Sequence, residues 1–137
     1  MHQKFELDLA EAQKIVIAVL AKAGESPDRP IAVAVTDREG SLVAFSRMDN
    51  CAPLPRRIAF AKAYTAGVMG NDTGQIAERM KNNNMKSSDL GDPGLVFVQG
   101  GVAIKSENGS ILGGIGVSGL AAQEDEDLAI IGLAALK

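Results

Sequence analysis

The chain has 137 residues, and 46% of them are hydrophobic, which is enough to build the core of one domain spanning residues 1–137. A formal net charge of −3 argues against a nucleic-acid-binding surface, which would be basic, and against attraction to anionic membranes. No apolar run approaches the length of a membrane span, and the first dozen residues lack the apolar centre of a signal peptide, so we expect a soluble cytoplasmic protein.

The N-terminal part predicts a helix followed by a β-hairpin. Asp8 is an N-cap residue with Glu11 as its capping-box partner, and apolar residues then recur at helical spacing until Gly24. Residues 31–36 and 41–47 predict two strands, and the turn at 37–40 between them ends in glycine. The hairpin makes these two strands antiparallel.

The middle of the chain predicts two helices and an exposed loop. Pro55 suits the first turn of a helix that runs to about Met69, and a further helix is expected from Asp72 or Thr73 to Lys81. Residues 82–94 are polar and predict a loop.

Three β runs and a helix complete the pattern. The runs are 95–99, 102–106 and 110–117, with an Asn-Gly hairpin turn between the last two, and the helix covers 123–136. The sequence therefore predicts an α/β (α+β) sandwich, with an antiparallel sheet of five strands and helices packed on it.

Residues 114–119 match the GxGxxG pattern of a dinucleotide-binding turn, but the context excludes that site. Such a turn needs a further parallel strand with an acidic residue about 20 positions on. Only one acidic-capped helix follows here, and its first turn would repel a pyrophosphate. We therefore expect no nucleotide cofactor. Glycines on a strand leave one sheet face bare, which suits a closely packed helix, a ligand or a subunit contact.

Several segments together resemble the GlcG/HbpS family, whose members include haem-binding and haem-degrading proteins. Similar domains occur at the C-terminus of some corrinoid adenosyltransferases. The resemblance rests on AKAYTA at 61–66, GGVAI at 100–104, Asn-Gly at 108–109, GGIGVSG at 113–119 and Asp-Glu at 125–126. It implies a profilin-like sandwich, a small-molecule ligand such as haem or a related tetrapyrrole, and a homo-oligomer of two to eight copies.

The residues that could ligate haem iron are few. His2 is the single histidine and lies at a terminus, where chains commonly fray. The other candidates are Met48, Met80, Met85 and Tyr64.

A second group of residues predicts a site on the helix that follows Pro55. Lys62 and Thr65 share one helix face with apolar residues, so Lys62 either extends to water or points its charge into a pocket, as a binding or catalytic group. Arg56 and Arg57 at the start of this helix oppose its dipole, so solvent, Asp49 or an anionic ligand should offset them. Gly100 and Gly101, from the GGVAI segment that resembles the family, complete the set of predicted ligand-binding residues, which also contains Arg56, Arg57 and Asp49.

Three functions remain open from the sequence. The first is binding of haem or another small ligand. The second is catalysis on a small anionic organic substrate with Lys62 and Thr65 in the pocket. The third is a non-catalytic oligomeric scaffold that uses the glycine-rich face as its interface.

Overall fold

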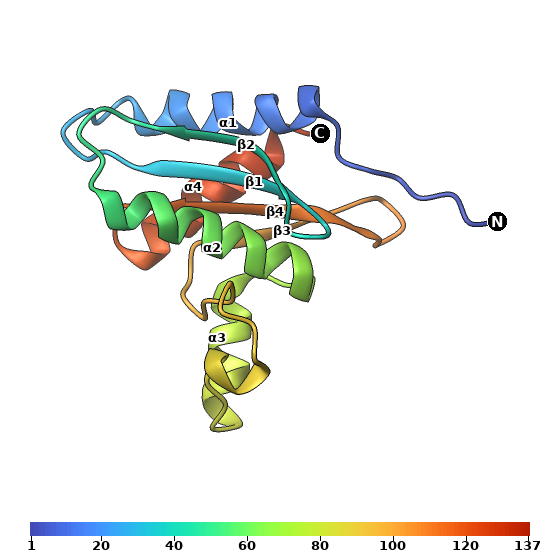
Figure 1. The fold of residues 1–137 in the computed structure, drawn as a ribbon. Helices are drawn as coiled ribbons and strands as arrows, with labels where there is room; N and C mark the ends of the chain where they lie inside the picture. Colours follow the sequence, from blue (N-terminus) through green and yellow to red (C-terminus); the bar gives the residue numbers. More distant parts are fainter.

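The computed structural model describes residues 1–137 as an antiparallel sheet with helices on both of its faces (Figure 1). Helices α1 and α4 lie on one face, and α2 lies on the other. The elements in chain order are α1 (Leu9–Ala23), β1 (Ala32–Asp37), β2 (Leu42–Arg47), α2 (Pro53–Met69), α3 (Thr73–Asn82), a 3₁₀ helix η1 (Ser87–Leu90), β3 (Gly101–Lys105), β4 (Ile111–Ser118) and α4 (Ala122–Ala134).

The sheet has four strands in the order β2-β1-β4-β3, so the prediction of five strands is wrong. The predicted strand at 95–99 does not form, because the outer edge of β3 is already occupied. The amide of Gly101 donates to Thr73 Oγ1 at 2.8 Å, and that of Ala103 donates to Asp72 Oδ1 at 3.0 Å. Two side chains at the start of α3 thus satisfy the amides that a fifth strand would have paired.

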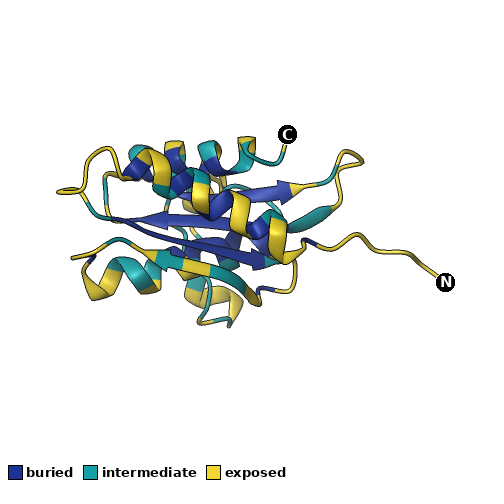
Figure 2. Ribbon diagram, turned by 90° about the horizontal axis from the view of Figure 1, so that it is seen from above, coloured by how far each residue is buried: buried dark blue, intermediate teal, exposed yellow.

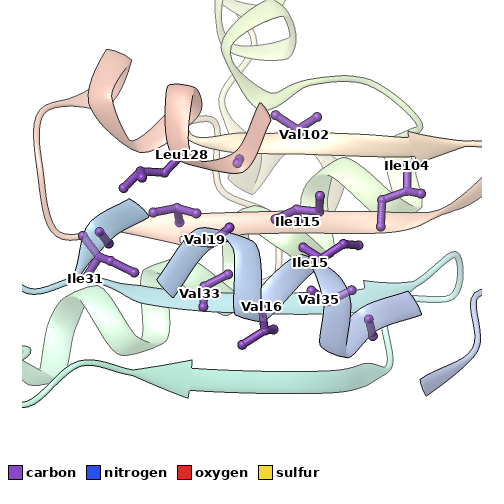
Figure 3. Packing of buried hydrophobic residues seen from close by; sticks show 14 of the residues in the cluster. Ile15, Val16, Val19, Ile31, Val33, Val35, Val102, Ile104, Ile115 and Leu128 are labelled. Carbon is purple, nitrogen blue, oxygen red and sulfur yellow. The ribbon is translucent and has the colours of Figure 1, made fainter. Parts of the chain in front are cut away.

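The main hydrophobic core lies between the sheet and the α1–α4 layer (Figure 3). Aliphatic side chains fill it, among them Ile15 and Val19 from α1, Val33 from β1, Ile115 from β4 and Leu128 from α4. The capping box predicted at the start of α1 is confirmed, because Asp8 and Glu11 each accept a hydrogen bond from the other's backbone amide.

The opposite face of the sheet packs on α2 through very small residues. Ala59 and Ala63 of α2 lie on β4, where a side chain at Gly114 or Gly116 would clash with their carbonyl oxygens. The glycines of the GGIGVSG segment therefore admit a helix at close range. Since α2 covers this face, it offers no interface to another subunit.

Helix α3 and η1 project away from the sandwich on the side of α2 (Figure 1). We call residues 73–91 the arm. The central strands β1 and β4 are almost fully buried, whereas β2 is half-buried or exposed along its length (Figure 2). Helix α2 begins at Pro53, two residues before the predicted start. None of the helices combines the length and apolarity needed to cross a membrane.

Candidate functional site

The side chain of Lys62 is buried at the end of the sheet and links the two helical layers. Its Nζ donates to the carbonyl oxygen of Val117 at 2.9 Å and to Asp125 Oδ2 at 3.1 Å. Both charged side chains are nearly inaccessible to solvent, at 2% for Lys62 and 3% for Asp125. Asp125 Oδ1 also accepts the amide of Leu120, at 3.0 Å. A residue on α2 is therefore paired, past the ends of β3 and β4, with a residue on α4.

Burial perturbs both members of this pair. Loss of water lowers the pKa of the Lys62 ammonium, and the charge of Asp125 opposes that shift. Loss of water likewise raises the pKa of the Asp125 carboxyl, and Lys62 and the Leu120 amide oppose that shift. Each group therefore depends on the other to stay charged inside the protein.

Gly100 and Gly101 lie against Lys62 and leave room for it. Gly100 has φ of +128°, and a Cβ there would stand 2.5 Å from Lys62 Nζ. A Cβ on Gly101 would stand 2.6 Å from the Lys62 carbonyl oxygen. The structure thus brings three of the predicted site residues together, in a position where the glycines accommodate the lysine.

Thr65 lies one turn further along α2, and its hydroxyl makes two internal hydrogen bonds. Its Oγ1 donates to the Ala61 carbonyl at 2.7 Å and accepts the amide of Val96 at 2.9 Å. Thr65 therefore holds the 95–99 segment onto α2. The catalytic role predicted for Lys62 and Thr65 stays a prediction.

The two arginines and Asp49 lie apart from Lys62, around the start of α2. Arg56 donates through Nε and Nη2 to the Cys51 carbonyl at 3.0 and 2.7 Å, which closes the loop before the helix. Arg57 and Asp49 are exposed, and neither takes part in any of the three ion pairs of the chain. Of the three offsets that the sequence left open, Asp49 forms no ion pair with either arginine, while Arg56 donates to a backbone carbonyl and Arg57 is exposed to solvent.

Two of the candidate iron ligands are engaged in internal hydrogen bonds. The Tyr64 hydroxyl donates to Asp92 Oδ2 at 2.6 Å, and this bond raises the pKa of the phenol. Haem iron would be ligated by the phenolate, so this bond disfavours Tyr64 as a ligand. The sulfur of Met48 accepts the amide of Ile31 at 3.4 Å and packs against the core.

The remaining candidates are His2, Met80 and Met85. His2 is exposed in the segment before α1. Met80 and Met85 are half-buried on the arm, and the Met85 amide donates to the Met80 carbonyl at 2.8 Å. The arm also carries exposed cations that could meet the propionates of a haem, namely Arg79, Lys81 and Lys86. The residue types present on the arm therefore fit haem ligation, with thioether sulfur as the donor atom.

A shallow cavity of about 350 Å³ lies at the base of the arm. Its lining includes Ser87, Ser88 and Asp92, the partner of Tyr64. No group of three or more His, Cys, Asp or Glu side chains is placed to hold a metal ion by itself. Iron held by this chain would thus depend on ligands that a porphyrin supplies.

The family model described as "Haem degrading protein HbpS-like" matches residues 7–134. The chain belongs to the HbpS-like family. Protein GlcG of Escherichia coli K12 is 34% identical over 110 residues, covering 78% of this chain and 80% of GlcG. The resemblance to the GlcG/HbpS family is thereby confirmed.

Solved structures agree with this assignment. A double mutant of Streptomyces reticuli HbpS is 30% identical and superposes with a TM-score of 0.89, covering 100% of this chain and 91% of HbpS. A complex of PduOC with haem superposes with a TM-score of 0.85 at 24% identity, covering 96% of this chain and 95% of PduOC, and shows a shared fold. The predicted relation to corrinoid adenosyltransferases is confirmed as well, since PduO of Citrobacter freundii is 27% identical over 134 residues, 95% of this chain and 39% of PduO.

Among the residues that matter at this site, sequence reasoning missed the pairing role of Asp125. The signal was present, since a lysine on an otherwise apolar helix face needs a buried partner, and residues 124–127 are all acidic. Nothing local indicated which of the four carboxylates it would be.

Proposed function

We propose that this chain binds haem or a related tetrapyrrole. The observation that carries the proposal is the match of an HbpS-like, haem-degrading family over residues 7–134. The superposition of the fold on PduOC, which was crystallised with haem, adds support. When bound, the group would supply iron-centred redox chemistry, and the role of the protein would be to ligate, orient and partly cover it.

The arm is the part of the chain whose free side chains suit this ligand. Met80 and Met85 offer thioether sulfurs for the iron, and Arg79, Lys81 and Lys86 offer positive charge for the propionates. Tyr64 donates its hydroxyl to Asp92 and so is held in the neutral form. The arm also makes few contacts with the sandwich, so the ligand could approach it without disturbing the core.

The test is a hemin titration followed by the Soret band. We expect saturation at one hemin per chain for the wild type. The double variant Met80→Ala, Met85→Ala should weaken binding by about tenfold or more, which corresponds to a loss of about 1.4 kcal/mol. Met69→Ala is the matched control, since Met69 is a half-buried methionine on α2.

The outcomes separate the function from its location. A wild-type titration without saturation or spectral change would overturn haem binding itself. Full affinity in the double variant, combined with a loss in His2→Ala, would move the iron ligand to the N-terminal segment and leave the function in place. Equal losses in the double variant and in Met69→Ala would show a general effect on folding and remove the assignment to the arm.

A further inference from the structure

A cavity of about 200 Å³ opens between the end of α1 and the start of α4, on the face of the sheet opposite α2. No residue of the arm lines it. Its floor is apolar and consists of Ala23, Leu120, Leu128 and Ile131, all of which belong to the main core or pack against it. The other lining residues are polar and form what we call the mouth, namely Lys22, Ser26, Arg29, Glu124 and Asp127.

A bidentate ion pair fixes one side of the mouth. Arg29, in the loop after α1, donates through Nη1 and Nη2 to the two carboxylate oxygens of Glu124 on α4, at 2.7 and 2.9 Å. The Ala121 amide donates to the same carboxylate at 3.3 Å. This two-point contact holds the loop to α4, so the cavity keeps its shape without a ligand. Both charges of the pair are already satisfied by each other.

The charges around the mouth are unequal in number. The cations are Lys22 and Arg29, and the carboxylates are Glu25, Asp28, Glu124 and Asp127. Lys22 pairs with Glu25 at 3.1 Å, which leaves no excess positive charge on α1. Arg47, which also lies beside the loop after α1, lines a separate cavity. Two cations therefore face four carboxylates, so the mouth attracts a cation and repels an anion.

Asp127 lines the cavity with a carboxylate that no cation neutralises. It takes part in none of the three ion pairs of the chain. Its Oδ1 accepts a hydrogen bond from Gln123 Nε2 at 2.9 Å, and no donor reaches its Oδ2. Asp127 stands next to Leu128 and about one helical turn before Ile131, so its carboxylate lies at the edge of the apolar floor. A free carboxylate beside an apolar floor suits a ligand with one positive end and a hydrocarbon body.

We propose that this cavity binds a small protonated primary amine with an aliphatic body. The ammonium donates to Asp127, with the Ser26 hydroxyl as a second acceptor at the mouth, and the hydrocarbon chain lies on the apolar floor. One water molecule takes about 30 Å³ in the liquid, so the cavity accommodates about seven groups of that size. Hexylamine, with its nitrogen and a chain of hexyl length, is an amine of this size. The site uses neither the arm nor haem.

The test is a titration of ¹⁵N-labelled, hemin-free protein at pH 7, followed by amide chemical shifts. Hexylamine should bind saturably, with shifts gathered on residues 22–29 and 120–131. Hexan-1-ol should bind about fivefold more weakly, the largest effect expected of an exposed ion pair, and hexanoate more weakly still. Propylamine is three methylenes shorter and should bind at least about tenfold more weakly than hexylamine, because each fully buried methylene contributes about fourfold.

Two variants separate contact with Asp127 from the general negative field. Asp127→Asn should weaken hexylamine binding about fivefold and leave hexan-1-ol binding unchanged, which also shows that the cavity stays folded. Asp28→Asn is the matched control, since it removes the same charge from an exposed residue that does not line the cavity, and should change binding less than about twofold. Shifts gathered elsewhere, equal affinities for the three hexyl compounds, or equal losses in the two variants would each overturn the proposal.

Discussion

Replacing Lys62 by methionine should destabilise the protein strongly. The side chains are similar in length, so the main change is the loss of the ammonium group that donates to Asp125 and to the Val117 carbonyl. Removing one partner of a buried ion pair leaves the other charge uncompensated, at a cost of about 3–5 kcal/mol. Small domains are stable by only about 5–15 kcal/mol, so a large part of the stability should be lost.

The loss of stability in Lys62→Met should increase as the pH rises. Burial already raises the pKa of Asp125, and removal of Lys62 takes away the charge that opposes this shift most, leaving only backbone amides such as that of Leu120. In the variant the folded state therefore binds the Asp125 proton more tightly than the unfolded state does. Stability of the variant should fall as pH rises from the ordinary carboxyl pKa through the raised one, so the difference from wild type is smaller at pH 5 than at pH 8.

Guanidinium unfolding at both pH values measures this difference. Lys22→Met is the control, since its ion pair with Glu25 is more than half exposed and should contribute less than about 1 kcal/mol. A loss below about 1 kcal/mol for Lys62→Met, or an equal loss at the two pH values, would refute the reasoning about a buried pair.

Three further predictions test other parts of the structure. Gly116→Ala should lower the free energy of unfolding by more than about 2 kcal/mol, because its Cβ would clash with a carbonyl oxygen of α2. Gly109→Ala meets no atom and should cost about 1 kcal/mol from its positive φ alone. Equal losses of the two variants in thermal unfolding would contradict this difference. The single tyrosine, Tyr64, should ionise above its ordinary pKa in an ultraviolet alkaline titration, because its neutral form donates a hydrogen bond to Asp92. Asp92→Asn should lower the midpoint of this titration. An unchanged midpoint in the variant would refute the hydrogen bond. Asp8→Ala should cost about 1 kcal/mol in chemical denaturation through loss of the α1 cap, and a neutral result would show that the cap is redundant.

The sequence predicted the elements well where local chemistry decides them. The start of α1 followed from Asp8 and Glu11, and both hairpins followed from their turns. The fifth strand failed for a non-local reason. The 95–99 segment has the composition of a strand, but its place beside β3 is taken by side chains some thirty residues away, Asp72 and Thr73.

The candidate site shows the same contrast between features that local sequence determines and features that depend on distant residues. The sequence indicated Lys62 as a charge on an apolar helix face, and the structure buries it. The contact of Gly100 and Gly101 with Lys62 was not predicted, because the two glycines were expected only as ligand-binding residues. Local sequence patterns could not identify the partner of Lys62, because Asp125 lies 63 positions after Lys62 and is one of four consecutive acidic residues. Whether Arg56 would meet a ligand or a backbone carbonyl depended on how the preceding loop folds, which no spacing rule specifies.

The link between Lys62 and Asp125 also bears on how the molecule opens. The two residues belong to helices on opposite faces of the sheet. If either helix separated from the sheet, the charged side chain of the other helix would remain buried without its partner. Hydrogen exchange should therefore find α2 and α4 opening together, as one cooperative unit, while the arm exchanges earlier and by itself. A single lysine would then make two layers, separated by a sheet, behave as one body.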